Sequence, residues 1–489
     1  MFLKGISIAS HPPIIVPEVG KGKELSAEKT IRGMKDMALA VAELKPEIIV
    51  CITPHGSVFR DGVSIVYETK IAGNLEEFGA PTVAIEKKCD MGLLEEMNRR
   101  FATAECETLF LNETTAKDYN IDRHLDHGCL VPLYFIEKVH PEYKVIHITI
   151  GELSLIELFR TGRVLREAIE AYGRDTVILA SADLSHCLKD EGPYRYHAMG
   201  SVFDKAITTG IVKKDYYSIL TLSPEIYEPA GQCGLRPIVM ALGATDSIKT
   251  EAQLFSYEGP FGVGYLSAFI RFNLKAEDPI NESLITRYEK DMMDQHEKRL
   301  NEEDPYVALA RMTVDKWVED GRKLSLDQYL KTLDDQKVVA QLTEQCAGTF
   351  VTLYKAGELR GCIGTIKPVT ENLGEEIIRN AIEASSYDPR FLPVETQELY
   401  QLEVSVDILE IPEYIENKEE LDPKRYGLIV EKGLRRGLLL PNLTGIETAE
   451  EQLAMAKHKA GILESETDDD DRLVMQRFKV ERHKTSVKF

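Results

Sequence analysis

Residues 176–186 read Thr-Val-Ile-Leu-Ala-Ser-Ala-Asp-Leu-Ser-His, a short apolar run that ends in an acid, a serine and a histidine. Its length and β-branched content are typical of a buried strand. Four similar runs occur within the first 275 residues, and amphipathic stretches of helical spacing lie between them. The runs are Gly5–Ala9, Glu47–Thr53, Lys144–Ile150 and Gly262–Phe272, and the helical stretches are Ala27–Leu44 and Leu153–Tyr172. This alternation predicts an α/β/α sandwich with a mainly parallel or mixed sheet.

Three of these predicted strands are followed by histidines. His11 comes after the first strand, His55 after the second, and His186 three residues after Asp183. In open α/β sheets, ligands bind beyond the carboxyl ends of the strands, where side chains distant in sequence converge. A single histidine near a strand end is usually an ordinary hydrogen-bonded residue, but three placed alike indicate a shared metal site. Asp183 either orients His186, lines the pocket or caps the turn after its strand.

Two further segments add polar groups to this predicted pocket. His127 precedes an apolar helix beginning near Val131 and is favoured over His124 as a pocket residue, because Gly128 follows it. Cys233, in a glycine-rich turn before another apolar helix, is either a soft third metal ligand or a small buried residue. Arg236 either clamps an anionic substrate, is a surface charge or pairs with a carboxylate.

Composition restricts the classes of partner. The chain has 489 residues and a formal charge of −22, which argues against nucleic acid. Its eight cysteines form no CxxC pairs, and no stretch reaches the length of about 18 apolar residues that a membrane span needs. We expect reduced thiols, a cytoplasmic location and no targeting segment.

A strongly charged stretch divides the chain. We predict a first domain at residues 1–275, a charged linker helix at 276–303 and a smaller α+β domain at 304–489. In the second domain Cys362 is expected in a turn, as a buried thiol rather than a reactive one, and Arg390 in an Asp-Pro turn. The run Asp468–Asp471 is interpreted as a solvated loop rather than a metal cluster. The predicted elements are strands at Thr349–Tyr354, Gln401–Leu409, Gly427–Glu431 and Gly437–Leu440, and helices at Val307–Val318, Leu373–Ser385 and Ala449–Ala460.

Five motifs of the first domain, in order, resemble those of the LigB-type class III extradiol dioxygenases and the related Memo proteins. They are Ser-His-Pro-Pro at 10–13, Thr-Pro-His-Gly at 53–56, Asp-His-Gly at 126–128, Ser-Ala-Asp-Leu-Ser-His at 181–186 and Cys-Gly-Leu-Arg-Pro at 233–237. The resemblance implies a mononuclear Fe(II) site with His11 and His55 as ligands, His186 as acid/base and His127 as a second pocket histidine.

The third ligand separates the two branches of this resemblance. Extradiol enzymes have a glutamate where this chain has Gln232-Cys233, whereas Memo proteins have a cysteine, and Glu228 is an outside alternative. A thiolate ligand admits Zn(II) or Cu(I) as well as Fe(II). The resemblance therefore implies an oxygen-dependent oxidoreductase acting on an aromatic or heteroaromatic small molecule. Its alternative is a non-catalytic, Memo-like protein that handles iron or copper or binds a peptide.

The second domain resembles the AMMECR family. The motifs are Leu-Arg-Gly-Cys-Ile-Gly-Thr at 359–365, Tyr-Asp-Pro-Arg-Phe at 387–391 and Gly-Leu-Leu-Leu-Pro at 437–441. The fusion of both halves resembles the AmmeMemoRadiSam system family, which implies a radical SAM enzyme as companion. This chain has no radical SAM cysteine motif, so the companion is expected to be a separate protein.

Overall fold

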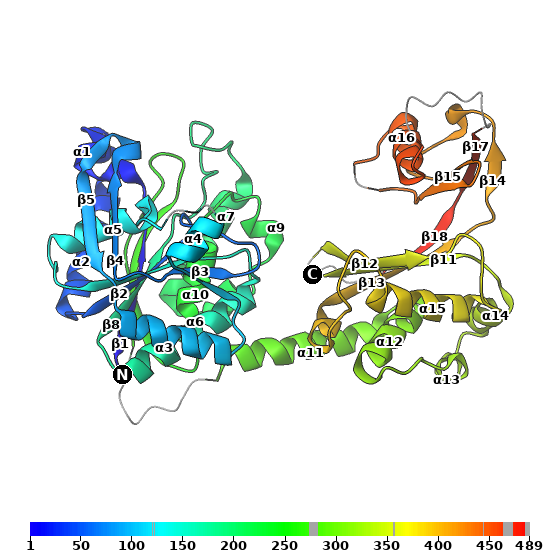
Figure 1. The fold of residues 1–489 in the computed structure, drawn as a ribbon, viewed down its shortest axis with the longest axis horizontal. Coiled ribbons are helices and arrows are strands. Elements are labelled where there is room, and N and C mark those ends of the chain that lie inside the picture. The colour runs from blue at the N-terminus through cyan, green and yellow to red at the C-terminus, as the bar shows by residue number, and fades with distance from the viewer. Residues whose placement is uncertain are drawn as a thin grey trace. The chain divides into compact units, whose positions relative to one another are not determined.

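The computed structural model describes residues 1–489 except 120, 122, 273–281, 356, 444, 463–472 and 485–489. The chain forms two compact units, Met1–Tyr288 and Glu289–Phe489 (Figure 1). Helix α11, Leu284–Glu302, contains the boundary between them and forms much of the predicted linker. Residues 276–281 of that linker and the aspartate run Asp468–Asp471 lie outside the described residues.

The first unit is built on one mixed sheet of eight strands, with the order β6-β3-β7-β2-β8-β1-β10-β9. Strands β2, β8 and β1 are adjacent and parallel, whereas β10 and β9 add to the sheet antiparallel. The predicted fold class is confirmed, and all five predicted strands are present. The strands are β1 (Leu3–Ala9), β2 (Ile48–Thr53), β3 (Val63–Val66), β6 (Thr108–Leu111), β7 (Lys144–Thr149), β8 (Thr176–Ser181), β9 (Thr250–Glu258) and β10 (Tyr265–Phe272).

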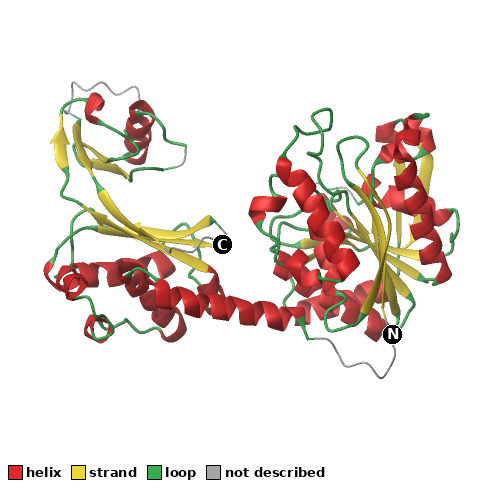
Figure 2. Ribbon diagram, turned by 180° about the vertical axis from the view of Figure 1, so that it is seen from behind, coloured by secondary structure: helices red, strands yellow, loops and turns green. Residues whose placement is uncertain are grey.

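Helices cover both faces of this sheet (Figure 2). The helices α2 (Glu28–Glu43) and α5 (His127–Glu137) pack together, as do α6 (Leu155–Tyr172) and α10 (Leu235–Gly243). Helices α6 and α10 approach closely because each has a glycine at their contact, Gly162 on α6 and Gly243 on α10. A Cβ at Gly162 would lie 1.7 Å from the carbonyl oxygen of Met240. This contact holds α10 against α6, and α10 also packs against β8 of the sheet. The turn that carries Cys233 directly precedes α10. The other helices of the unit are α1 (Pro17–Gly20), α3 (Met91–Thr103), α4 (Glu113–Tyr119), α7 (Ala198–Lys213), α8 (Tyr216–Leu220) and α9 (Pro224–Tyr227).

A two-stranded hairpin stands apart from the main sheet. Its strands β4 (Lys70–Leu75) and β5 (Ala80–Lys88) pair antiparallel, and a short 3-10 turn at Glu76–Phe78 joins them. Gly79 ends that turn with φ of 74°, a conformation that favours glycine. The hairpin thereby places the Phe78 ring against that of His127, with centroids 5.1 Å apart.

The second unit is an α+β structure with two antiparallel sheets, as predicted. The sheets have the orders β12-β11-β13-β18 and β14-β17-β15-β16. Cys362 lies on strand β12 and not in a turn, because Gly361–Gly364 pair with the neighbouring strand and leave no reversal at the cysteine. The strands are β11 (Thr349–Lys355), β12 (Glu358–Gly364), β13 (Leu402–Leu409), β14 (Glu413–Ile415), β15 (Gly427–Lys432), β16 (Arg435–Leu439), β17 (Val474–Phe478) and β18 (Val480–Lys484). The helices are α12 (Pro305–Asp320), α13 (Leu326–Leu330), α14 (Gln336–Glu344), α15 (Leu373–Ser386) and α16 (Ala449–Lys459).

Arg390 and Cys362 are joined by a hydrogen bond in this unit. Arg390 pairs with Asp388 at 2.7 Å and donates to the carbonyl oxygen of Cys362, so it stabilises the Asp-Pro turn. Burial raises the pKa of the Cys362 thiol, which disfavours the reactive thiolate. Among the described helices of the whole chain, none is long and apolar enough to cross a membrane.

Candidate metal centre

His11 follows β1 and is almost completely buried, with 2% of its surface exposed. Its backbone N–H donates to Asp183 Oδ1 at 2.9 Å, and its ring Nδ1 lies 2.8 Å from Ser181 Oγ at the end of β8. The Ser181 hydroxyl donates its single proton to the carbonyl oxygen of Gly128 at 2.6 Å. Nδ1 of His11 therefore carries the proton, and in the neutral ring Nε2 keeps a lone pair directed at the site.

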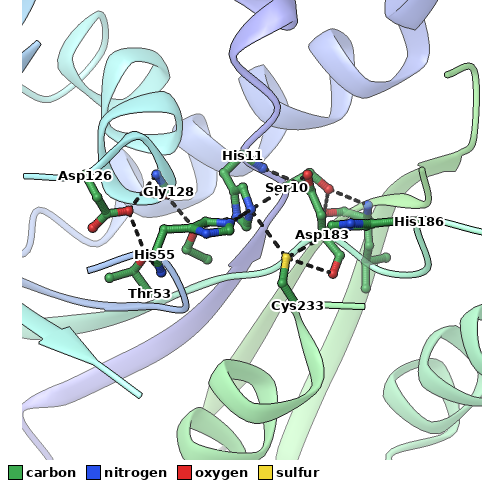
Figure 3. A network of polar contacts seen from close by, with 11 residues as sticks. Ser10, His11, Thr53, His55, Asp126, Gly128, Asp183, His186 and Cys233 are labelled. Atoms are coloured by element: carbon green, nitrogen blue, oxygen red, sulfur yellow. Dashed lines mark hydrogen bonds and ion pairs between the residues drawn. The ribbon is translucent and has the colours of Figure 1, made fainter. Parts of the chain in front are cut away.

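His55 stands in the turn after β2, and its Nε2 lies 2.9 Å from Nε2 of His11 (Figure 3). The turn is held by Thr53, whose Oγ1 accepts from the His55 backbone N–H at 3.2 Å and donates to Asp126 Oδ1 at 2.8 Å. Asp126 Oδ1 also accepts from the Gly128 N–H at 2.7 Å and caps α5. One carboxylate thus connects the His55 turn with the helix that begins at His127.

Cys233 completes the cluster from the turn before α10. Its Sγ lies 3.6 Å from Nε2 of His11 and 3.7 Å from Nε2 of His186 (Figure 3). The segment after β8 that carries His186 is joined to the Cys233 turn by an isolated bridge between Ser185 and Gln232. This pairing fixes the position of His186 relative to that of Cys233.

The donor set fits a transition-metal ion. His11 Nε2, His55 Nε2 and Cys233 Sγ all lie within 4.8 Å of one another. The 2.9 Å between Nε2 of His11 and Nε2 of His55 would allow both nitrogens to reach one ion. Imidazole nitrogen and thiolate sulfur together suit Fe(II), Zn(II) or Cu(I).

Burial determines the protonation state of the cluster. Burial, His55 and His127 hold the pKa of His11 well below 6.5, and burial and His127 lower that of His55 to about 4. Burial and the Asp183 carboxyl raise the pKa of the Cys233 thiol. At neutral pH the imidazoles are therefore uncharged acceptors, and metal binding must displace the thiol proton.

His127 and His124 line a cavity of about 610 Å³ beside this cluster. The ring of His127 stacks on His55 with centroids 4.4 Å apart, and Phe78 packs against it at 5.1 Å. His124 is exposed at the cavity wall. The structure therefore brings the His127 ring into contact with His55, whereas His124 lies at the exposed wall of the cavity.

Asp183 faces His11 instead of His186. Beyond the backbone hydrogen bond, its Oδ2 lies 3.7 Å from Nε2 of His11, and burial raises its pKa to about 7. In the described part of the chain no hydrogen bond joins its carboxyl to the His186 ring. Its position supports a role in orienting His11.

The alternatives to Cys233 lie elsewhere. Gln232 Oε1 accepts from the Leu235 N–H at 2.8 Å and so caps α10, and Glu228 is exposed at the end of α9. Arg236, on the first turn of α10, has a buried Nε without a hydrogen-bond partner. No hydrogen bond or ion pair joins Arg236 to the donor cluster among the residues that the structure describes.

The sequence reasoning did not assign Thr53, Asp126 or His147. His147 lies on β7 and its Nε2 is 2.7 Å from Asp126 Oδ2. Burial opposes ionisation of Asp126, but hydrogen bonds from His147 and Thr53 outweigh it and lower the carboxyl pKa. The sequence could have indicated His147, because it is a histidine inside an otherwise apolar strand and buried polar groups need partners.

Two protein-family models match the chain. The model described as the catalytic LigB subunit of aromatic ring-opening dioxygenase matches residues 5–268, and the AMMECR1 model matches residues 307–483. A protein of Clostridium acetobutylicum is 40% identical over 486 residues, which cover 99% of this chain and 100% of the relative. A protein of Thermotoga maritima is 49% identical over 183 residues, 37% of this chain and 98% of the relative.

Two solved structures are also similar to parts of the chain. An uncharacterized protein of Pyrococcus horikoshii shares 33% identity, covers 36% of this chain and 88% of its own, and has a TM-score of 0.32. An uncharacterized protein of Escherichia coli K12 shares 13% identity, covers 54% of this chain and 99% of its own, and has a TM-score of 0.39.

Proposed function

We propose, because this chain belongs to the family of the catalytic LigB subunit of aromatic ring-opening dioxygenases and continues into an AMMECR1 domain, that its first unit is an Fe(II)-dependent oxidoreductase. Its substrate is an aromatic or heteroaromatic small molecule, and O₂ is the oxidant. The observation that supports this proposal is the convergence of His11 Nε2, His55 Nε2 and Cys233 Sγ within 4.8 Å.

The residues around the donors have separate tasks in this proposal. A bound Fe(II) ion would supply open positions where substrate and O₂ meet. His186 is the acid/base: burial lowers its pKa, so it is neutral at pH 7 and accepts a phenolic proton at Nε2. The ring of His127, stacked on His55, forms the wall beside them.

Cys233 supports a second candidate function. A thiolate in place of the glutamate of extradiol enzymes resembles the Memo branch, in which the same pocket handles iron or copper without turnover. A soft sulfur donor also favours Cu(I) and Zn(II) over metals that prefer carboxylate ligands, such as Mg(II), Ca(II) and Mn(II). In either case we propose a separate radical SAM protein as companion, a proposal that co-purification tests directly.

Metal analysis of the full chain, purified without oxygen and reconstituted with Fe(II), tests the proposal. We expect about one iron per chain in the wild type and its loss in His11→Ala, His55→Ala and Cys233→Ala. His140→Ala is the matched control, since His140 contacts the carbonyl oxygen of Pro46 and stands outside the donor set. Failure of the reconstituted wild type to bind any metal would refute both candidate functions.

Oxygen uptake then separates the two candidates. With a panel of catechols in an oxygen electrode, the oxidoreductase predicts consumption that His186→Ala abolishes while iron is retained. Tight metal binding with no consumption by any catechol favours the metal-handling protein. Cobalt substitution identifies the third donor: a sulfur-to-cobalt charge-transfer band in the near ultraviolet should be present in the wild type and absent in Cys233→Ser.

A further inference from the structure

A second cavity, of about 450 Å³, lies beside the metal centre and contains none of its donor atoms. Pro12 and Pro13, which directly follow His11, form part of its wall. Phe78 lines both this cavity and the imidazole-lined one. The apolar space therefore begins one residue from a metal donor and shares an aromatic ring with the neighbouring pocket.

Tyr265 supplies this cavity with an unused polar group. It lines the cavity, is only 3% exposed, and sits at the start of β10 with its backbone bridged to Asp183. No hydrogen-bond partner for its hydroxyl occurs among the residues that the structure describes. The hydroxyl of this cavity-lining tyrosine is therefore available to donate to a ligand.

Two lysines at the rim of the cavity supply positive charge. Lys21 and Lys23 are exposed, and neither forms an ion pair within the described ranges. The carboxylate of nearby Glu24 is occupied by the Gly22 N–H at 2.7 Å. Lys21 is held in place as the residue that ends α1, with φ of 50° and its N–H bonded to the carbonyl oxygen of Pro17. Two unpaired cations at one opening, in a chain of charge −22, create a local preference for anions.

We propose that this cavity binds the anionic end, a carboxylate or phosphate, of an organic molecule whose apolar stem packs against Pro12, Pro13 and Phe78. Tyr265 donates its hydroxyl to the anion, and Lys21 and Lys23 balance its charge. The other end of the molecule lies toward the metal centre. The inference rests on the proposed function, because the molecule is taken to be the substrate of that centre.

Calorimetric titration of the metal-loaded full chain, without oxygen and at low salt, tests the inference with three probes of equal stem. The probes are 3-phenylpropionate, 2-phenylethyl phosphate and the neutral 3-phenylpropanamide. We expect at least one anion to bind about tenfold or more tightly than the amide, and the tighter of the two anions identifies the class of anionic group. Tyr265→Phe should weaken that anion about tenfold and leave the amide unchanged.

The double variant Lys21→Gln/Lys23→Gln should weaken the anion severalfold and remove most of the salt dependence of its binding. Lys213→Gln/Lys214→Gln is the matched control, because it also removes two positive charges that are close in the sequence. Lys214 has φ of 59° and so shares the left-handed conformation of Lys21. Equal binding of anion and amide, or anion binding unaffected by both the tyrosine and the lysine variants, would overturn the inference.

The same titration with His11→Ala separates this inference from the proposed function. Selective anion binding in that variant, together with loss of metal, supports the cavity as an independent binding site. Anion selectivity in a wild type that consumes no O₂ with any substrate contradicts the oxidoreductase and leaves the anion site standing. If the wild type consumes O₂ but binds the anions no more tightly than the amide, the result contradicts the anion site and leaves the oxidoreductase proposal intact.

Discussion

Ser181 Oγ lies 2.8 Å from Nδ1 of His11 and determines which nitrogen of that ring holds the proton. Because the serine proton is given to the carbonyl oxygen of Gly128, the hydroxyl can only accept from the imidazole. Partners of this kind orient metal-binding histidines and raise their affinity. We therefore expect Ser181→Ala to weaken metal binding about 10- to 100-fold while the fold is retained.

Competition against a chromophoric chelator measures this effect. Ser7→Ala is the control, since Ser7 is also buried, lies on β1 and has a hydroxyl without a partner. Equal affinities for the two variants would show that the tautomer of His11 is set by some other contact.

Asp126 is expected to matter for both stability and metal affinity. It accepts from Thr53 and Gly128 and contacts His147. We predict that Asp126→Ala lowers the free energy of unfolding by about 1.5–3 kcal/mol and weakens metal binding. Urea denaturation and the chelator assay check the two effects, with exposed Asp118→Ala as control. A change in affinity without a change in stability would contradict the bridging role.

The stability of the metal-free protein should depend on pH through His55. Burial and His127 lower its pKa from 6.5 to about 4, so the unfolded chain binds more protons between these values. The free energy of unfolding therefore falls as the pH decreases from 6.5 to 4. His55→Gln should reduce this fall, measured by denaturation at a series of pH values. Parallel pH profiles of wild type and variant would exclude the depressed pKa.

Asp183 should change the pH dependence of the free energy of unfolding in the opposite direction to His55. Burial raises its pKa from 3.8 to about 7, so the folded state holds a proton that the unfolded chain has lost between these values. The carboxyl thereby reduces stability as the pH rises through this window. In the metal-free protein, Asp183→Asn should remove that loss and be relatively more stable near pH 7.5 than near pH 4. A constant difference between the two proteins across the series would contradict this assignment.

Glu376 should stabilise the second unit alone. Its fully buried carboxylate accepts from the backbone N–H groups of Val369 and Thr370 at 2.9 Å and from the hydroxyls of Thr370 and Thr365. Glu376→Gln places two donors where only acceptors fit, and we expect a loss of about 1.5–3 kcal/mol. Trp317, the sole tryptophan, reports unfolding of this unit by fluorescence.

Exposed Glu358→Gln is the control for this measurement. The iron content of the Glu376→Gln protein should equal that of the wild type, because the donor cluster belongs to the other unit. Loss of iron would mean that the two units depend on each other for folding.

The sheet and the proximity of His11 and His55 were predictable because their signals are local. Apolar runs mark β1, β2 and β8, and the rule that ligands gather at carboxyl ends brings His11 and His55 together. The three strands are indeed adjacent and parallel, and this adjacency places the two Nε2 atoms 2.9 Å apart.

The rest depended on tertiary contacts that local patterns do not encode. The positions of Glu228, Gln232 and Cys233 depend on the turn before α10, where Gly231 adopts φ of 56° and Gln232 turns back to cap the helix. Asp183 was linked to His186 by proximity in sequence, yet its carboxyl accepts a hydrogen bond from the backbone of His11, which follows β1. Tyr265 appears as an ordinary strand residue until the cavity that it lines is known.

The sheet order has a consequence for the timing of biosynthesis. His11 and Cys233 are 222 positions apart in the chain, and β1 acquires its antiparallel neighbour only when β10 has been made. At ribosomal rates of about 5–20 residues per second, the first donor waits roughly 10–45 s for the third. A nascent chain therefore passes through an interval in which His11 and His55 have been made and Cys233 has not, so the three-residue donor set can assemble only after the turn before α10 has been synthesised.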